Sequence, residues 1–198
     1  MFVQVIQGRV KDAGALRKTL DRWTDEIKPG AEGWLGATGG VTEDGEFVSF
    51  VRFESEEAAR RNSDRPEQTE WWNEFSQNLE GEPTFIDSTD VTLWDDGGSD
   101  DAGFVQIIQG HVKDRNRYTK MMEASQGDVS NSRPDVIGGV HVWDGDNFVE
   151  AVYFTSEAEA RKGESQGNEE FQEQMQEWQD LVDDVRFTDL RDPILSSP

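Results

Sequence analysis

Two adjacent tryptophans, Trp71 and Trp72, are the residues of this 198-residue sequence that most strongly suggest a ligand site. They lie in a helix-length segment that also carries Phe75. Neighbouring helical positions differ by about 100° around the axis, so only one of the two indoles can point fully into a core. The other is expected to line a cavity, an interface or the surface. A cavity wall of this kind would hold an aromatic ligand, whereas the alternative is plain packing at a domain boundary.

Polar side chains on expected strands and helix ends form the second group of candidates. Gln4 lies in an alternating strand, and a buried amide there needs a partner, either within the protein or on a ligand. Arg52 lies on an expected central strand, where it could pair with a carboxylate such as Glu54 or hold a phenolate. Asn62 falls among three arginines, at positions 60, 61 and 65, that could position an anionic group. The complete set of pocket candidates is Gln4, Trp34, Arg52, Asn62, Trp71, Trp72 and Phe75.

Other chemistries are disfavoured by composition. The sequence has no cysteine, which excludes thiolate catalysis and disulfides, and its two histidines with scattered carboxylates predict no metal site. A net charge of −23 repels phosphate backbones and anionic lipid, so we expect neither nucleic-acid nor membrane partners. The N-terminus shows no targeting pattern, which predicts a cytoplasmic protein.

The sequence is internally duplicated. The segment 2–12, FVQVIQGRVKD, returns as 104–114, FVQIIQGHVKD, with nine of eleven positions identical at a spacing of 102. In both copies a strand with alternating apolar residues ends at a glycine and passes into a helix-length polar segment. We therefore predict a first repeat at 1–96, an acidic, glycine-rich linker at 97–103 and a second repeat at 104–198.

The same order of elements is expected in each copy. In the first, apolar positions from Leu16 to Ile27 predict one helix that stops at Pro29. A hairpin follows in each copy around an Asp-Gly turn, then a helical region opened by serine, and finally a strand, at about 85–94 and 185–190. Each repeat thus reads β-α-β-β-α-β, the ferredoxin-like arrangement of an α+β protein.

This order, with a split second helix bearing aromatics and a glycine-containing hairpin before the Arg-Phe-Glu-Ser motif at 52–55, resembles the antibiotic-biosynthesis-monooxygenase-like family of dimeric α+β barrels. The resemblance implies that the two repeats pair sheet to sheet as a pseudo-dimer within one chain, with further homodimerisation open. It also implies a ligand cavity between sheet and helices. The paired tryptophans and clustered arginines occur only in the first copy, so we place the pocket there.

The resemblance implies a cofactor-independent monooxygenase acting on a small aromatic or phenolic molecule, in which the substrate carbanion itself reduces dioxygen. Two alternatives stay open. The barrel could bind a small hydrophobic ligand without turnover or serve a structural role, because fold alone does not decide function. It could also resemble the heme-degrading members, which is disfavoured because neither His111 nor His141 lies on the helix that would supply an axial ligand.

Overall fold

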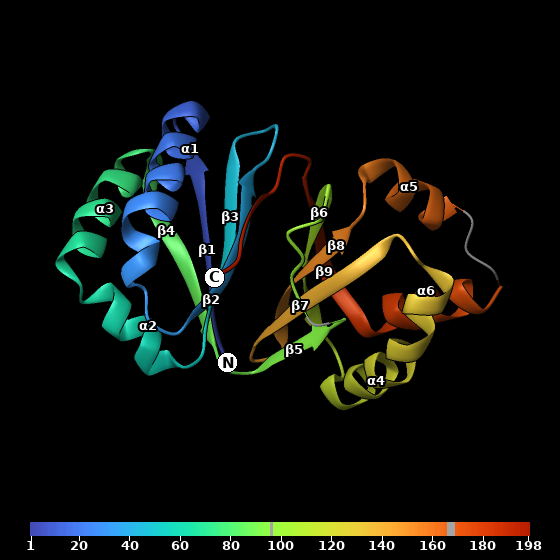
Figure 1. Ribbon diagram of the computed structural model, residues 1–198. Helices are drawn as coiled ribbons and strands as arrows, with labels where there is room; N and C mark the ends of the chain where they lie inside the picture. The colour runs from blue at the N-terminus through green and yellow to red at the C-terminus, as the bar shows by residue number, and fades with distance from the viewer. Residues whose placement is uncertain (96, 166–168) are drawn as a thin grey trace. The chain divides into compact units, whose positions relative to one another are not determined.

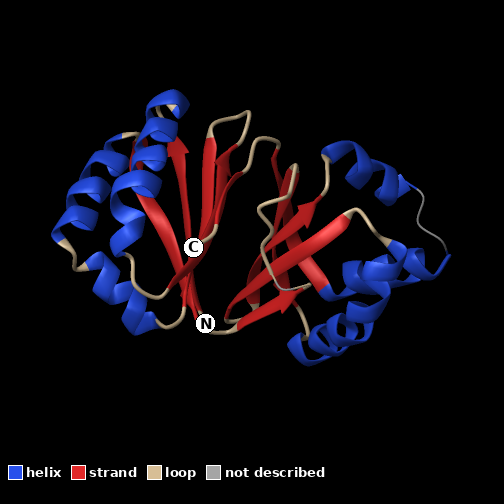
Figure 2. Ribbon diagram, in the orientation of Figure 1, coloured by secondary structure: helices blue, strands red, loops and turns tan. Residues whose placement is uncertain are grey.

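The computed structural model describes residues 1–95, 97–165 and 169–198, with the side chains of 125–132 and 169–171 outside that description. The predicted end of the first repeat, at residue 96, therefore lies outside the described residues. The chain forms two compact units, one comprising Met1–Thr89 with Asp192–Pro198 and the other Asp90–Arg191. Each unit is a five-stranded antiparallel sheet with helices packed on one face (Figures 1 and 2).

The first unit has the strand order β10-β2-β3-β1-β4. Its elements in chain order are β1 (Phe2–Val10), α1 (Ala13–Arg22), the π-helical turn η1 (Trp23–Ile27), the 3₁₀ turn η2 (Lys28–Gly30), β2 (Trp34–Val41), β3 (Glu46–Phe53), α2 (Glu56–Ser63), α3 (Pro66–Gln77), β4 (Leu79–Ser88) and, from the end of the chain, β10 (Ile194–Ser196).

The second unit has the matching order β5-β7-β8-β6-β9. Its elements are β5 (Val91–Trp94), β6 (Phe104–Val112), α4 (Arg115–Ser132), β7 (Val136–Asp144), β8 (Asn147–Phe154), α5 (Glu157–Ser165), α6 (Glu169–Leu181) and β9 (Val182–Leu190). The two α+β units with a shared ferredoxin-like order confirm the predicted fold class.

Local sequence explains where the helices begin. The Asp12 carboxylate caps α1 by accepting a hydrogen bond from the Ala15 amide at 2.9 Å. The Ser55 hydroxyl caps α2 in the same way through the Ala58 amide at 3.2 Å, as its position after the strand predicted. The predicted helical segment does run to Ile27, but it is not α-helical throughout, because α1 ends at Arg22 and the chain widens into the π-helical turn. Apolar spacing alone does not distinguish such a turn from a regular helix.

The last strand of the first repeat and the end of the second depart from expectation, whereas the strand predicted at 185–190 is present in β9 (Val182–Leu190). The sequence predicts one strand over 85–94, but β4 ends at Ser88 and β5 joins the sheet of the other repeat, where Trp94 pairs with Gly139. Reciprocally, β10 lies at the end of the second repeat yet pairs with β2, placing Ser196 opposite Ala37. Within its own repeat, β2 has only β3 as a neighbour, and its free edge exposes unpaired backbone groups. β10 pairs with these groups. We call β5 and β10 the exchanged strands, because each pairs in the sheet of the other repeat.

Candidate functional site

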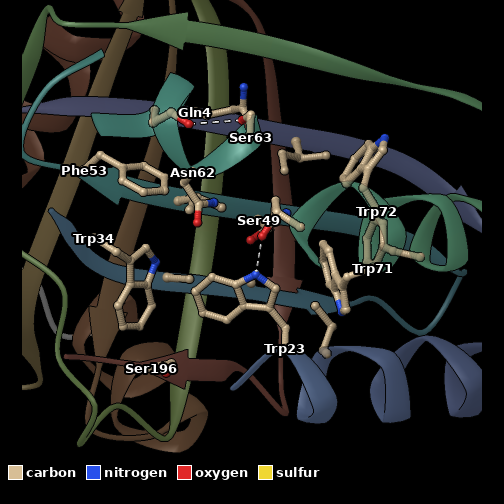
Figure 3. Close-up of a pocket in the computed structure, with 18 of the residues that line it drawn as sticks. Gln4, Trp23, Trp34, Ser49, Phe53, Asn62, Ser63, Trp71, Trp72 and Ser196 are labelled. Carbon is tan, nitrogen blue, oxygen red and sulfur yellow. Dashed lines mark hydrogen bonds between the residues drawn. The ribbon is translucent and has the colours of Figure 1, made fainter. Parts of the chain in front are cut away.

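A cavity of about 340 Å³ lies between the sheet and the helices of the first unit. It is walled by the five strands on one side and by α1, η1, α2 and α3 on the other (Figure 3). Its volume suits a ligand of two or three fused rings, since small-molecule sites begin at roughly 300 Å³. The lining residues are Gln4, Ile6, Leu20, Trp23, Thr24, Trp34, Ala37, Gly39, Phe47, Ser49, Val51, Phe53, Ala59, Asn62, Ser63, Gln68, Thr69, Trp71, Trp72, Phe75, Phe85, Ile194 and Ser196.

Small residues on the sheet leave space for the cavity. Gly39 on β2 lies opposite Ser49 on β3, and both line the cavity. A Cβ added at Gly39 would come within 2.7 Å of the Val48 carbonyl oxygen and 2.9 Å of the Ser49 Cβ, so the position tolerates no side chain without a backbone shift. Ala37, two residues earlier, faces the cavity because alternate strand residues share a face.

Tryptophans form the helical wall. The Trp23 ring, at the start of the π-helical turn, lies 5.1 Å from the Trp34 ring and 6.4 Å from the Trp71 ring. Trp71 is 7% exposed, and its indole nitrogen donates a hydrogen bond to the Thr19 carbonyl at 2.7 Å. Trp72 is half-buried and packs on Phe85, which is 47% exposed and so marks the rim of the cavity.

The polar candidates differ in what they already bind. The Gln4 amide lines the cavity but donates to the Asp87 carboxylate at 2.8 Å. Asn62 is 7% exposed, and its carbonyl oxygen accepts from the Arg65 guanidinium at 2.9 Å.

Arg52 does not line the cavity, which corrects the sequence-based candidate set. Val51 and Phe53 face the cavity from β3, and the alternation of a strand turns Arg52 to the opposite face of the sheet. The other candidates, Gln4, Trp34, Asn62, Trp71, Trp72 and Phe75, are brought together along one cavity.

The arginines near Asn62 do not line the cavity in the described part of the chain. Arg60 pairs with Glu56 at 2.6 Å on the helix surface, and Arg61 is exposed. The Arg65 guanidinium donates to the Asn62 side chain and to the Ile27 carbonyl, the latter at 3.2 Å, and so reaches the cavity only through Asn62. Of the three arginines expected to position an anionic group, only Arg65 therefore contacts a lining residue, and it does so through the Asn62 side chain.

Several lining residues were missed from the sequence. Trp23 and Leu20 lay on the predicted helix face and could have been found there. Ser196 and Ile194 could not, because they arrive on the exchanged strand β10.

Every lining side chain contributed by the described residues is uncharged: the set contains no Asp, Glu, Lys, Arg or His. Both histidines lie in the second unit, where His111 contacts Asp183 at 2.8 Å and buried His141 contacts Glu150 at 3.4 Å. Among the described residues there is also no cluster of three potential metal ligands, and no helix is long and apolar enough to cross a membrane. The cavity can therefore orient and hydrogen-bond a ligand but offers it no charged group.

Known structures share this architecture along the whole chain. No protein-family model and no curated protein matches the sequence. A protein provisionally named a monooxygenase from Fusobacterium nucleatum superposes with a TM-score of 0.80 at 13% identity, covering 99% of this chain and 94% of that one. A second protein with the same provisional name, from Lactobacillus acidophilus, superposes with a TM-score of 0.75 at 13% identity, covering 99% of this chain and 95% of that one. An anthrone oxidase-like protein gives 0.64 at 9% identity and covers 95% and 89%.

At sequence identities this low, the superpositions establish a common fold. The chain has a monooxygenase-like, tandemly repeated α+β fold, and the resemblance predicted from the sequence is confirmed at that level.

Proposed function

We propose that the chain oxidises a small phenolic or anthrone-type aromatic molecule with dioxygen in the cavity of the first unit, without a cofactor. The observation that carries this proposal is an aromatic cavity with uncharged hydrogen-bonding groups among its lining residues. The names of the full-length neighbours, two provisional monooxygenases and one anthrone oxidase-like protein, support the same class of reaction.

The reaction balances without an external reductant. A ring CH₂ flanked by aromatic rings becomes a carbonyl, one atom of dioxygen enters the product, and the other leaves in water with the two hydrogens. The deprotonated substrate supplies the electrons. The residues of the chain hold the ring between indoles, exclude bulk water and donate hydrogen bonds to the oxygen on which negative charge develops.

The absence of ionisable groups among the described lining residues has a kinetic consequence. With no side chain to act as general base, the substrate loses its proton to water, and the rate follows the ionisation of the substrate. We expect kcat/KM to rise with pH to a plateau set by the substrate pKa. Two phenols of different pKa should give profiles displaced by that difference. A shared inflection would instead indicate a protein base.

Oxygen consumption with anthrone tests the proposal. We expect one dioxygen consumed per anthraquinone formed, above the uncatalysed rate, and a loss of roughly tenfold or more in Trp72→Ala, which removes part of the wall. Trp178→Ala is the matched control, because Trp178 packs on exposed Phe187 of the second unit as Trp72 packs on Phe85. No uptake above background with any phenol tried would remove the oxygenase assignment.

Binding without turnover is the second candidate, and the uncharged lining favours it. It predicts that anthrone binds and that oxygen consumption stays at the background rate. A heme-degrading role is not supported, because the described lining residues include no histidine to bind the iron. A hemin titration that produced a ligated Soret band would overturn that conclusion.

A further inference from the structure

The indole N–H of Trp34 is a buried donor without a partner. Trp34 is 5% exposed, lines the cavity, and its Nε1 has no hydrogen-bond acceptor in the described part of the protein. The indoles of Trp23 and Trp71 behave differently, since they donate to the Gln68 side chain at 2.8 Å and to the Thr19 carbonyl at 2.7 Å. Buried indole N–H groups normally find an acceptor. Two described indole nitrogens lack one, those of Trp34 and Trp94, and of these only Trp34 lines the cavity, where a ligand would supply the acceptor.

Asn62 provides a second donor at the same end of the cavity. A guanidinium only donates, so the Arg65 contact identifies the Asn62 oxygen and leaves the amide NH₂ as its other polar group. Among the described residues that NH₂ has no acceptor. Arg65 is itself fixed by the Ile27 carbonyl and lies against Gly30. Figure 3 shows Trp34 and Asn62 together at one end, with Trp71 and Trp72 at the other.

The packing separates these two ends. Trp34 belongs to a core cluster with Phe2, Phe53 and Ala58, whereas Trp71 and Phe75 belong to another. Trp23 packs against both clusters and so lies between the ends. Beyond Trp72 the cavity reaches its exposed rim at Phe85. The cavity therefore has a donor end at Trp34 and Asn62 and an aromatic end that reaches the surface at Phe85.

We propose that Trp34 is the specificity-determining residue of this cavity: its indole N–H binds an uncharged acceptor oxygen, a ring ketone, of a fused aromatic ligand that inserts oxygen first. The proposal rests on the cavity of the proposed function and names the ligand group that it selects. A carboxylate would bring a full charge among lining residues without a cation, within a chain of net charge −23, so the ketone is favoured. Asn62 contributes the second hydrogen bond.

The test compares two probes, fluorenone and fluorene, in the absence of dioxygen, because they share a tricyclic skeleton and differ in the ketone. Equilibrium dialysis gives the Kd of each for the wild-type chain and for Trp34→Phe, which keeps an aromatic ring and removes the N–H. We expect the preference for fluorenone over fluorene to fall roughly fivefold in Trp34→Phe, the value of one neutral hydrogen bond. Trp23→Phe is the matched control, because its N–H is already bound to Gln68. Its preference should stay within about twofold of wild type.

An infrared measurement reports the hydrogen bond to the ketone directly, even if a substitution also changes the Kd values by altering the shape of the cavity. The carbonyl stretch of bound fluorenone should lie at lower frequency in the wild-type chain and in Trp23→Phe than in Trp34→Phe. An unchanged preference and an unchanged stretch in Trp34→Phe would overturn the proposal. Neither readout involves oxygen consumption. Failure of the oxygenase assignment therefore appears as binding without turnover, and failure of this proposal as binding without ketone selectivity.

Discussion

The two units have the same order of elements, but they differ at the place where the first is hollow. The sheet register pairs Gly39 with Ser49 in the first unit and His141 with Glu150 at the corresponding position of the second. The latter two are 2% and 3% exposed, and the His141 ring stacks on Phe148 at 5.1 Å. The space left by a glycine and a serine in one copy is filled by an imidazole and a carboxylate in the other.

The exchanged strands β10 and β5 show the same difference, a small residue in the first unit and a large one in the second. Ser196 lies opposite Ala37 in the first unit, and Trp94 lies opposite Gly139 in the second. A Cβ added at Gly139 would meet the Trp94 ring at 3.0 Å, so the indole rests directly on the backbone there. A serine at the equivalent point leaves room for a ligand.

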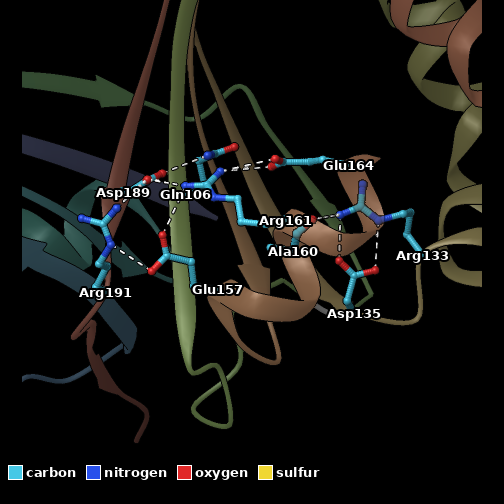
Figure 4. Close-up of polar contacts among 9 residues, drawn as sticks. All are labelled: Gln106, Arg133, Asp135, Glu157, Ala160, Arg161, Glu164, Asp189 and Arg191. Atoms are coloured by element: carbon cyan, nitrogen blue, oxygen red, sulfur yellow. Dashed lines mark hydrogen bonds and ion pairs between the residues drawn. The ribbon is translucent and has the colours of Figure 1, made fainter. Parts of the chain in front are cut away.

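The helices that cover the two sheets differ in the same way. Asn62 of α2 corresponds to Gly163 of α5, and a Cβ on Gly163 would overlap the Arg133 guanidinium. Arg133 forms a buried bidentate pair with Asp135 at 2.7 and 2.9 Å (Figure 4). Where the first unit presents an amide to a cavity, the second places an internal ion pair. At these matching positions, therefore, the first copy has a cavity and the second has buried polar and charged side chains.

The largest effect is expected from removing the exchanged strand of the first unit. Deleting residues 192–198 removes β10 and with it the cavity wall formed by Ile194 and Ser196. We expect fluorenone affinity to fall roughly a hundredfold, because the ligand loses apolar contact on one side. Deleting only residues 197–198 keeps β10 and should retain binding. A folded 192–198 deletion that binds within twofold of wild type would show that β10 is no part of the site.

Substitutions of Trp72 on α3 and Trp178 on α6 distinguish an effect on stability from an effect on binding. Trp72→Ala and Trp178→Ala each remove a half-buried indole from an exposed phenylalanine, and each should destabilise the chain by about 2 kcal/mol in denaturant unfolding. Only Trp72→Ala should weaken fluorenone binding, by about tenfold. Equal losses of affinity in both variants would contradict the assignment of the ligand to the first unit.

The smallest effect concerns the core of the second unit. Burial, and then the charge of Glu150, raise the pKa of Tyr118 well above its ordinary value. The neutral phenol therefore contributes its full stability below about pH 10, and this is lost as pH rises further, at about 1.4 kcal/mol per pH unit.

Tyr118→Phe removes that dependence. The unfolding free energy of the variant, relative to wild type, should rise by about 1 kcal/mol between pH 10 and pH 11, because the unfolded phenol is only half ionised at pH 10. Urea titrations at the two pH values measure it. A difference between the two proteins that is independent of pH would show that the Tyr118 pKa is not raised in the folded state.

Much of the fold could be predicted from the sequence because duplication shows each element twice. The repeat at 2–12 and 104–114 and the two Asp-Gly turns gave the element order, and adjacent Trp71 and Trp72 pointed to the helix that lines the cavity. Three features could not be predicted. The π-helical turn at Trp23 has no distinct periodicity, the side of a strand that Arg52 faces depends on register, and the exchange of β5 and β10 is a long-range choice of partner.

The ligand stoichiometry tests the central claim, that the first of two similar units holds the ligand, most directly. Isothermal titration with fluorenone should give one site per chain, and Ser196→Trp, which introduces into the first unit the residue found at the matching position of the second, should abolish that site. Two sites per chain, or one site that persists in Ser196→Trp, would contradict the account.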